Sequence, residues 1–355
     1  MFGVRVDKKR LLKRRIRRRK ILLILECFCL TVLLVTAFFI HQIEKLDYTK
    51  LDESVLECQN TPKGYFNFAL FGLDSREGEL EGGVRSDCIM IANLDTRTGE
   101  LKLVSVYRDT LLKQQDGTYD KANAAYSYGG PQEAIAMLNR NLDLGIEQYA
   151  AVNFNSLSEI VDILGGIDIE LTSEEIFWLN GYAAETSQVV GKETTHIDEN
   201  APGVHHLDGI QAVSFTRIRY TQGDDFKRAQ RQRIVLEQIL KKIKSSGPWK
   251  WMQIVENVLP QISTNMDTAT LLKLGAQMFH LKIGEMKGFP FDIATSDSVI
   301  GLAGSYAAAI GHADNVKQLH EFFFQEMDYQ PSEVVLQVDA DVAYLTGIYP
   351  ENYIQ

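Results

Sequence analysis

The sequence predicts an α/β protein, an α/β/α sandwich on a mixed central sheet, preceded by one N-terminal transmembrane helix. Short apolar runs with the length of strands alternate with segments of helical spacing, which is typical of a sheet covered by helices on both faces. Two of the runs are joined by a turn signal, which predicts an antiparallel hairpin inside that sheet. A long apolar run near the N-terminus supplies the membrane span.

The first 20 residues differ in charge from the rest of the chain. They hold eleven Lys or Arg and one Asp, a net charge of +10; of the 37 basic and 47 acidic residues in the whole chain, the remainder therefore holds 26 and 46, or −20. Residues 21–41 form an apolar run long enough to cross a bilayer. By the positive-inside rule, residues 1–20 are a cytoplasmic tail and everything after His41 is exported. We therefore expect a single-pass protein of the cell membrane.

Two other interpretations of this N-terminus have less support. A cleaved signal peptide needs a small-residue cleavage site, and no Ala-x-Ala-like site follows the run. Nucleic-acid binding by the Arg-rich tail would be accompanied by aromatic interleaving or a recognition motif, and the chain shows neither. We therefore expect a membrane partner and no nucleic acid. Glu26 lies near the cytoplasmic end of the span, where it can snorkel or pair with Arg17 or Arg18.

A polar stretch at residues 42–63 predicts an extracellular stalk between the span and the folded domain. Of the four cysteines, Cys27 and Cys29 lie in the span and Cys58 and Cys88 lie beyond it. Two exported cysteines could form one disulfide, but two are too few to indicate a disulfide framework. The sequence leaves that pairing open.

The first predicted strand, residues 65–73, is a short apolar run that ends at Asp74. Such a run is typical of a buried strand in a sheet that is covered on both faces. In α/β sheets, the loops that follow strand ends are where ligands bind. Asp74 is therefore a candidate site residue.

The predicted hairpin consists of residues 88–94 and 101–107. If the turn between them is symmetric, Asp87 faces Arg108 at the open end of the hairpin. A bulged turn would shift this register by one residue. A carboxylate and a guanidinium group are thus expected side by side.

The next elements follow ordinary start and stop signals. We expect a helix opened by Gly130 and Pro131 and closed at Gly145, a helix over 156–164 with a Ser156–Glu159 capping box and a Gly165 stop, and a half-buried strand over 167–171. Residues 182–204 are polar and lack periodicity, so we expect a mobile insertion there.

The most informative segment, residues 215–233, concentrates arginines in a domain that is otherwise acidic. From Asp225 onward it has helical spacing, with an apolar stripe that passes, near the helix start, through Gln232, Arg231 and Arg228. Polar residues thus occupy the face that should be buried, and basic residues in a first turn also oppose the helix dipole. Because two local preferences are violated, we expect a bound anion there. The alternative is a solvated charged helix whose Arg stems lie on apolar surface.

Several arginines with a few carboxylates, and no His or Cys among them, indicate phosphate chemistry assisted by a hard cation. Asp74 and Asp87 are the acidic candidates. The alternative for Asp87 and Arg108 is a plain salt bridge. His205 and His206 have no third ligand nearby in sequence, so we expect no zinc site there.

At this point the chain resembles the LytR-CpsA-Psr family. The motifs that carry the resemblance are FGLDSR at 71–76, RSD at 85–87, SVYRDT at 105–110, KANAAY at 121–126, GG at 129–130, GGIDIE at 165–170, TRIR at 216–219 and DFKRAQRQ at 225–232. Their order and spacing both match. Tyr107 departs from the pattern, because the family usually has Pro there. The resemblance covers residues 64–325, which are then the catalytic domain, with 326–355 as a C-terminal extension that could be part of the same domain.

The resemblance implies a single-span membrane protein of mainly Gram-positive bacteria, which moves a glycopolymer such as teichoic acid or capsule from a polyprenyl pyrophosphate carrier to peptidoglycan. The implied cofactor is Mg²⁺, or Mn²⁺ in its place. The candidate site then comprises Asp74, Asp87 and Arg108 as catalytic residues, Asp74 and Asp87 as metal ligands, and Arg76, Arg85, Arg108, Arg217, Arg219, Arg228, Arg231 and Gln232 as pyrophosphate ligands.

Two functions of other classes stay open at the level of sequence. The chain could be a non-catalytic regulator that binds polyprenyl phosphate, or a lipid pyrophosphatase that transfers the phosphoryl group to water. The presence of both Asp74 and Asp87 favours catalysis, because an anion site gains nothing from carboxylates without a cation. The identity of the polymer, and the choice between sugar, water and protein as acceptor, are not encoded in any motif found here.

Overall fold

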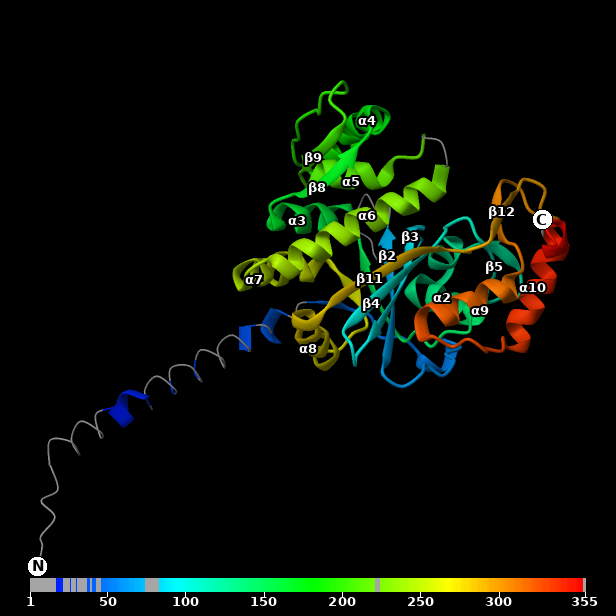
Figure 1. Cartoon of the computed structure of the whole chain (residues 1–355), viewed down its shortest axis with the longest axis horizontal. Coiled ribbons are helices and arrows are strands. Elements are labelled where there is room, and N and C mark those ends of the chain that lie inside the picture. The colour runs from blue at the N-terminus through cyan, green and yellow to red at the C-terminus, as the bar shows by residue number, and fades with distance from the viewer. Residues whose placement is uncertain are drawn as a thin grey trace, which may run out of the picture. The chain divides into compact units, whose positions relative to one another are not determined.

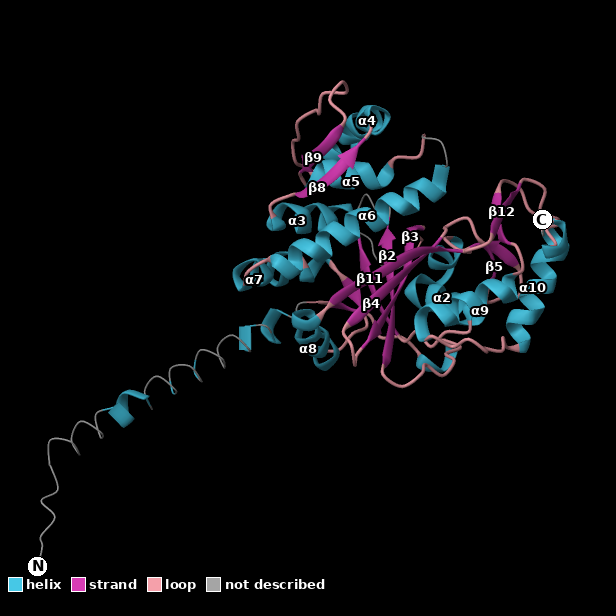
Figure 2. Ribbon diagram, in the orientation of Figure 1, coloured by secondary structure: helices cyan, strands magenta, loops and turns pink. Residues whose placement is uncertain are grey.

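A seven-stranded mixed sheet forms the centre of the domain that begins at Leu46 (Figures 1 and 2). In spatial order its strands are β1 (Asp47–Tyr48), β10 (Ser263–Thr264), β7 (Gln148–Val152), β2 (Tyr65–Leu73), β3 (Ser86–Asp95), β4 (Glu100–Val106) and β11 (Lys282–Phe289). β3 is antiparallel to β2 and β4, whereas β2 is parallel to β7 and β4 is parallel to β11. The mixed α/β fold with a central mixed sheet is therefore confirmed.

The computed structural model describes residues 17–21, 26, 30, 37–38, 40–42, 46–73, 83–220 and 224–353. Within these ranges no helix is both long and apolar enough to span a membrane. Most of the apolar run at 21–41 lies outside the described residues, as do Asp74 and Arg76. The transmembrane helix therefore stays a prediction.

Helices cover both faces of the sheet, and three small two-stranded sheets complete the domain. The helices are α2 (Ala124–Leu142), α3 (Phe154–Leu164), α4 (Ser173–Val190), α5 (Gly209–Arg217), α6 (Asp224–Ser245), α7 (Pro248–Asn257), α8 (Thr268–Gln277), α9 (His312–Phe324) and α10 (Glu333–Thr346). The small sheets pair β5 (Leu111–Lys113) with β6 (Tyr119–Lys121), β8 (Ile167–Leu171) with β9 (Gly203–Leu207), and β12 (Ile293–Ser296) with β13 (Tyr306–Ala309).

The alternation of side chains along the central strands makes two cores. Phe71 and Val104 point to the face that α2 and α9 cover. Phe68 and Leu103 point to the opposite face, where α6 and α8 pack. A further apolar cluster joins α3, α4, α5 and the β8–β9 pair to α6. α6 therefore packs against both the sheet and this second cluster, so it is held on two sides.

The hairpin has the register that the symmetric turn predicts. Leu94 pairs with Leu101, and the pairing continues without a shift from Asp95 to Ile89. Asp87 and Arg108 consequently meet at the open end, where Arg108 Nη1 lies 2.9 Å from Asp87 Oδ1. β2 and β8 also have the predicted bounds.

Three local predictions were wrong. The helix expected to open at Gly130 begins at Ala124, contains non-helical backbone at Gly129 and Gly130, and ends at Leu142 with Asp143 as the left-handed cap, not at Gly145. The cap of α3 is Asn153, whose side chain accepts a hydrogen bond from the Ser156 backbone N–H, and not the proposed Ser156–Glu159 box. Glu159 instead pairs with Lys192.

The third error concerns residues 182–204, which were expected to form a mobile insertion. The first nine of them belong to α4, which a Thr172–Glu175 capping box opens. Ile176, Leu179 and Ala183 bury one side of this helix. The polar composition of its second half conceals this narrow apolar stripe. The remaining residues lead to β9, whose start at Gly203 was also missed.

The segments that flank the central domain in sequence contribute to its core. Leu51 and Leu56 lie in the range expected to be a stalk, yet both are buried in the cluster formed by α2 and the sheet. Near the C-terminus, Val338 and Val342 of α10 are buried beside Ala308 of β13. These contacts make residues 46–63 and 333–346 part of the folded unit.

The capping assignment of α3 predicts a difference between two single substitutions. Asn153→Ala should lower the free energy of unfolding by about 1 kcal/mol, the usual loss for a helix N-cap. Glu159→Ala removes only the partly exposed ion pair with Lys192, and should change the free energy of unfolding by less than about 0.5 kcal/mol. Urea denaturation of both variants measures this, and a larger loss for Glu159→Ala would restore the Ser156–Glu159 box.

Candidate functional site

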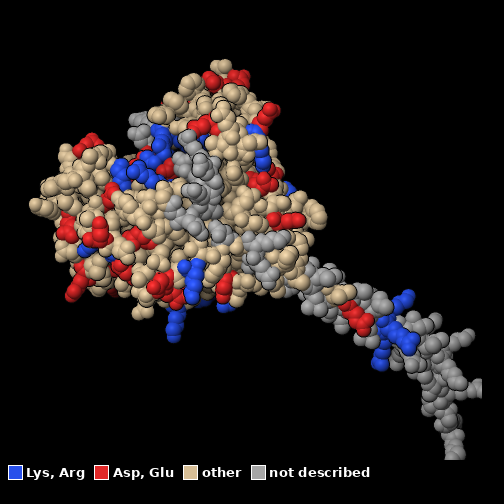
Figure 3. All heavy atoms as spheres, turned by 180° about the vertical axis from the view of Figure 1, so that it is seen from behind, with Lys and Arg blue, Asp and Glu red and all other residues tan. Residues whose placement is uncertain are grey.

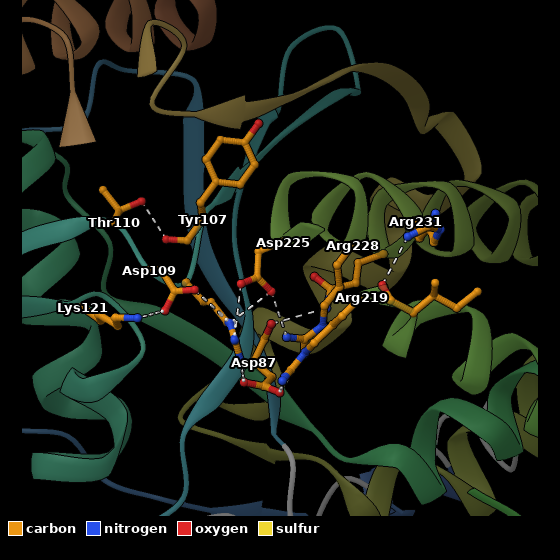
Figure 4. Close-up of polar contacts among 12 residues, drawn as sticks. Asp87, Tyr107, Asp109, Thr110, Lys121, Arg219, Asp225, Arg228 and Arg231 are labelled. Carbon is orange, nitrogen blue, oxygen red and sulfur yellow. Dashed lines mark hydrogen bonds and ion pairs between the residues drawn. The ribbon is translucent and has the colours of Figure 1, made fainter. Parts of the chain in front are cut away.

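Asp87 lies at the centre of the candidate site and contacts three guanidinium groups from three elements (Figure 4). Its carboxylate is 2.9 Å from Arg108 Nη1, 2.9 Å from Arg219 Nη2 and 2.6 Å from Arg228 Nη2. Asp87 stands near the start of β3, Arg108 follows β4, Arg219 follows α5 and Arg228 lies in α6. The cluster forms because the hairpin register and the packing of α6 on the sheet bring these four positions together.

Burial and charge act in opposite directions on Asp87. Burial by itself would raise the pKa of the Asp87 carboxyl, but the neighbouring charges of Arg228, Arg108 and Arg219 outweigh it and hold that pKa below its usual value. Asp87 is therefore ionised at neutral pH. Its side chain is 11% exposed and that of Arg228 is 5% exposed, so this ion pair is removed from solvent.

The arginines retain capacity for a further anion. Arg228 Nε and Nη1 are buried and make no hydrogen bond within the described part of the chain. Arg108 Nε likewise makes no hydrogen bond there, but Arg108 Nε and Arg228 Nη1 lie 3.3 Å and 3.6 Å from Asp225 Oδ1. A buried donor that is left unbonded costs about 1–3 kcal/mol, so Arg228 Nε indicates that an anionic ligand completes the site.

Two further carboxyl groups, those of Asp109 and Asp225, lie beside this centre and were not among the candidates from sequence. Asp109 and Asp225 share a hydrogen bond, and Arg108 Nε is 3.3 Å from a carboxylate oxygen of each. Lys121 Nζ lies 2.8 Å from Asp109. In Figure 4, Asp109 lies beside Lys121, and Asp225 lies between Asp109 and Arg228. Asp109 directly follows Arg108, and Asp225 precedes Arg228 by one helical turn, which are the signals that could have identified them.

The two carboxyls differ in proton affinity. Burial and the hydrogen bond to Asp109 raise the pKa of Asp225. Burial acts on Asp109 in the same direction, but the hydrogen bonds from Asp225 and Lys121 and the charge of Arg108 leave its pKa lowered. The two carboxyls therefore titrate as an interacting pair, in which Asp225 has the higher proton affinity.

An apolar pocket opens beside the arginines. Asp87, Arg217, Arg228 and Gln232 form its polar end. The rest of its wall comes from the sheet, α3 and α6, and includes Leu70, Met90, Leu157, Ile160, Val235, Leu236 and Ile239. A ligand that fills both parts must carry an anionic group at one end and a hydrocarbon chain at the other.

The remaining candidates from sequence are distributed around this centre. Gln232 Nε2 donates to the Asp87 backbone carbonyl at 3.3 Å. Arg217 lines the pocket but pairs with Glu185 at 3.0 Å. Arg231 is buried and pairs with Glu175 at 3.0 Å, away from Asp87 in Figure 4. Arg85 is exposed. The structure thus brings Asp87, Arg108, Arg219, Arg228 and Gln232 together, while Asp74 and Arg76 lie outside the described residues.

Neither the histidines nor the cysteines form a second candidate centre. His206 binds Asp168 and the Gly165 carbonyl, and His205 binds the Ala201 carbonyl. In the described ranges no group of three His, Cys, Asp or Glu side chains is arranged to hold a metal ion. Cys58 and Cys88 are both free. Burial raises the pKa of the Cys88 thiol to about 12, which keeps it protonated.

The donor set nevertheless fits one kind of metal site. Mg²⁺ is usually bound through one or two carboxylates, with substrate phosphates and waters as its other ligands. Asp87 and the Asp109–Asp225 pair supply hard oxygen donors next to guanidinium groups that attract a phosphate. A cation bound together with a phosphorylated ligand is compatible with this arrangement.

Charge at the surface agrees with a localised anion site. The chain carries a net charge of −10. On the face seen from behind in Figure 3, Asp and Glu side chains are widely spread, whereas Lys and Arg side chains gather in a few groups. Attraction of an anion therefore depends on local clusters of basic side chains and not on the overall field.

This fold and site define an α/β protein with a buried arginine–carboxylate centre at the mouth of an apolar pocket. The chain belongs to the LytR_cpsA_psr family, whose model matches residues 37–320. One relative is the polyisoprenyl-teichoic acid–peptidoglycan teichoic acid transferase TagU of Enterococcus faecalis, which is 32% identical over 206 residues. The match spans 57% of this chain and 61% of that relative.

Solved structures share the fold. TagT bound to LIIa-WTA matches with a TM-score of 0.58 and 19% identity, over 79% of this chain and 94% of that chain. Protein gbs0355 of Streptococcus agalactiae matches with a TM-score of 0.61 and 23% identity, over 79% of this chain and 92% of that chain. At these identities the likeness concerns the fold alone.

The Asp87 centre predicts a stability that depends on anions. Asp87→Asn removes the one carboxylate that Arg108, Arg219 and Arg228 share, and leaves Asp109 and Asp225 as counter-charges for Arg108 and Arg228 alone. It should lower the free energy of unfolding by about 3–5 kcal/mol, the scale for breaking a buried ion pair. Inorganic pyrophosphate should restore part of this loss by occupying the arginines. Thermal unfolding with and without pyrophosphate measures both effects.

Asp168→Asn is the matched control, because the Asp168 side chain is 51% exposed and pairs with His206. It should change stability little and should gain nothing extra from pyrophosphate. Equal behaviour of the two variants would show that Asp87 does not hold the arginines together.

Proposed function

We propose that this protein is a membrane-anchored phosphotransferase that works outside the cytoplasm. It moves a glycopolymer, such as teichoic acid or capsule, from a polyprenyl pyrophosphate carrier to peptidoglycan. The observation that supports this most directly is the joint presence of buried, incompletely bonded guanidinium groups and an apolar pocket at the same place. A polyprenyl pyrophosphate has the matching chemistry, an anionic group attached to a long hydrocarbon.

The arginines bind and orient the donor in this proposal. Arg108, Arg219 and Arg228 donate to the pyrophosphate oxygens, and Gln232 helps to position the same edge of the site. The hydrocarbon lies in the apolar pocket between α3 and α6. Phosphoryl transfer depends mostly on positioning and on the neutralisation of charge, which is what several convergent guanidinium groups provide.

The transfer itself exchanges one phosphorus–oxygen bond for another. The acceptor hydroxyl oxygen bonds to the phosphorus that carries the glycan, the bridging bond of the pyrophosphate breaks, and polyprenyl phosphate leaves. A carboxylate of the Asp87 and Asp109–Asp225 group receives the hydroxyl proton. Asp74 and Asp87 are the proposed ligands of Mg²⁺ or Mn²⁺, which when bound neutralises phosphoryl charge.

The guanidinium groups lead to a prediction about ligand affinity. Arg219→Ala and Arg217→Ala should each weaken binding of a polyprenyl phosphate by about 1.5–3 kcal/mol, the scale of a hydrogen bond to a charged group. Arg97→Ala is the matched control, because Arg97 is 59% exposed and pairs with Asp95 at the closed end of the hairpin. Isothermal titration calorimetry on the three variants tests this. Parent-like affinity in both site variants would place the anion elsewhere.

Turnover separates a transferase from a protein that only binds. With lipid-linked donor and uncrosslinked peptidoglycan, the parent should transfer glycan only when Mg²⁺ or Mn²⁺ is present. Asp87→Asn, assayed at a temperature where circular dichroism shows it folded, should transfer about 100-fold more slowly, because several kcal/mol of charge stabilisation is lost.

The same assay distinguishes the alternatives. Release of phosphate or free glycan without transfer to peptidoglycan would identify a lipid pyrophosphatase. Tight binding of polyprenyl phosphate with no turnover in the parent would identify a regulator. Parent-like transfer by Asp87→Asn would refute the role of this carboxylate while leaving the function intact.

A further inference from the structure

Three aromatic side chains form an exposed group beside the arginine centre. Phe177 and Trp178 lie in α4 and Tyr220 follows α5; we call these three residues the aromatic platform. Trp178 and Tyr220 lie with ring centroids 4.8 Å apart and an interplanar angle of 35°, and Phe177 meets Trp178 edge-on at 5.2 Å. Tyr220 is 65% exposed and Phe177 is 52% exposed. Packing against the apolar core therefore explains part of the position of Trp178, but it does not explain why the rings of Phe177 and Tyr220 lie there.

The aromatic platform is tied to the charged centre by the covalent chain. Tyr220 is the residue after Arg219, so their Cα atoms are about 3.8 Å apart. Arg219 Nη2 contacts Asp87 at 2.9 Å. Burial raises the pKa of Tyr182, and both Tyr220 and Arg219 also act on that pKa, so the aromatic platform and the Arg219 guanidinium group lie around the same tyrosine.

The aromatic platform and the apolar pocket lie on different sides of the centre. Arg228 lines the pocket and its side chain is 5% exposed. Arg219 contacts the same carboxylate, does not line the pocket, and has a side chain that is 39% exposed. The site therefore has a closed, apolar side next to Arg228 and an open side next to Arg219 and Tyr220.

We propose that the aromatic platform binds the first sugar rings of the glycan that the carrier pyrophosphate bears. This inference rests on the proposed function, and it names a subsite within it. The hydrocarbon and the sugar are attached to opposite ends of the pyrophosphate. When the hydrocarbon occupies the closed side, the sugar must leave by the open side, at Tyr220.

The chemistry of the aromatic platform suits a pyranose ring. One face of such a ring presents C–H groups, which pack against the electron-rich face of an aromatic side chain. The sugar hydroxyls need polar partners at the edge of the stack. Glu185, whose side chain is 42% exposed, is held near Tyr182 and Arg217 and can accept hydrogen bonds from the sugar hydroxyls. Arg219 can donate hydrogen bonds to the sugar hydroxyls.

The test compares one ligand with and without its sugar. The full-length protein in detergent is titrated with farnesyl pyrophosphate and with the same compound carrying a disaccharide on its terminal phosphate. The parent should bind the disaccharide conjugate more tightly. Tyr220→Ala should weaken binding of the conjugate about fivefold to tenfold, the scale of a lost aromatic contact, and should leave farnesyl pyrophosphate unchanged.

Two further variants separate the ring from its surroundings. Tyr220→Phe keeps the ring and should bind the conjugate nearly as the parent does. Tyr344→Ala on α10 is the control for loss of an exposed tyrosine, because Tyr344 is 67% exposed. It should affect neither ligand.

The possible results bear differently on the aromatic platform and on the proposed function. An equal loss for both ligands in Tyr220→Ala would show that Tyr220 supports the arginines, and would overturn the inference. The inference would also be overturned if the parent bound the disaccharide conjugate no more tightly than farnesyl pyrophosphate. The proposed binding of the lipid pyrophosphate would be unaffected by that result. Loss confined to a soluble peptidoglycan fragment would assign the aromatic platform to the acceptor instead of the donor. A parent that binds neither farnesyl compound would overturn the proposed function and this subsite together.

Discussion

The ion pairs between Asp87 and three arginines are the interaction on which the rest of the site depends. They join the start of β3, the end of β4, the end of α5 and the first turns of α6, four segments that share no continuous secondary structure. Asp87 would be costly to bury alone, and so would each guanidinium group. Together they neutralise one another, and the sheet can carry a charged centre next to an apolar pocket. The same contacts add to the apolar packing that holds α6, which walls that pocket.

The elements that the sequence predicts correctly are those in which one local pattern decides the structure. β2, β8 and the β3–β4 hairpin follow from apolar runs and a symmetric turn, and the hairpin register then yields the Asp87–Arg108 pair without any tertiary information. α6 was predicted from the helical spacing of its apolar residues, and the anion site was predicted from the basic residues that interrupt that apolar stripe. These arginines are required by the site and not by the helix, and this conflict can be recognised from the sequence alone.

The errors arise where a distant part of the chain determines the outcome. Asn153 caps α3 because its backbone is extended after β7, which spacing within the helix cannot show. The second half of α4 was taken for part of a mobile insertion, because its polar face is wide and its apolar stripe is narrow. Arg231 belongs to the same helical stripe as Arg228, yet it binds Glu175, since α4 packs close to it. The Asp109–Asp225 pair was missed because its members are 116 positions apart in the sequence and meet only in the folded chain, beside Arg108.

The carboxylate of Asp87 has a further consequence for the timing of events at the site. A phosphate that binds through the N–H groups already engaged by Asp87 must compete with that carboxylate, so this part of binding is an exchange of one anion for another and its net free energy is a difference. The affinity is accordingly lower than three free arginines would give. In the proposed transfer the same exchange runs in reverse when the anionic product departs, because Asp87 is part of the chain and pairs again with the guanidinium groups. This internal competitor would limit how long an anionic product is retained.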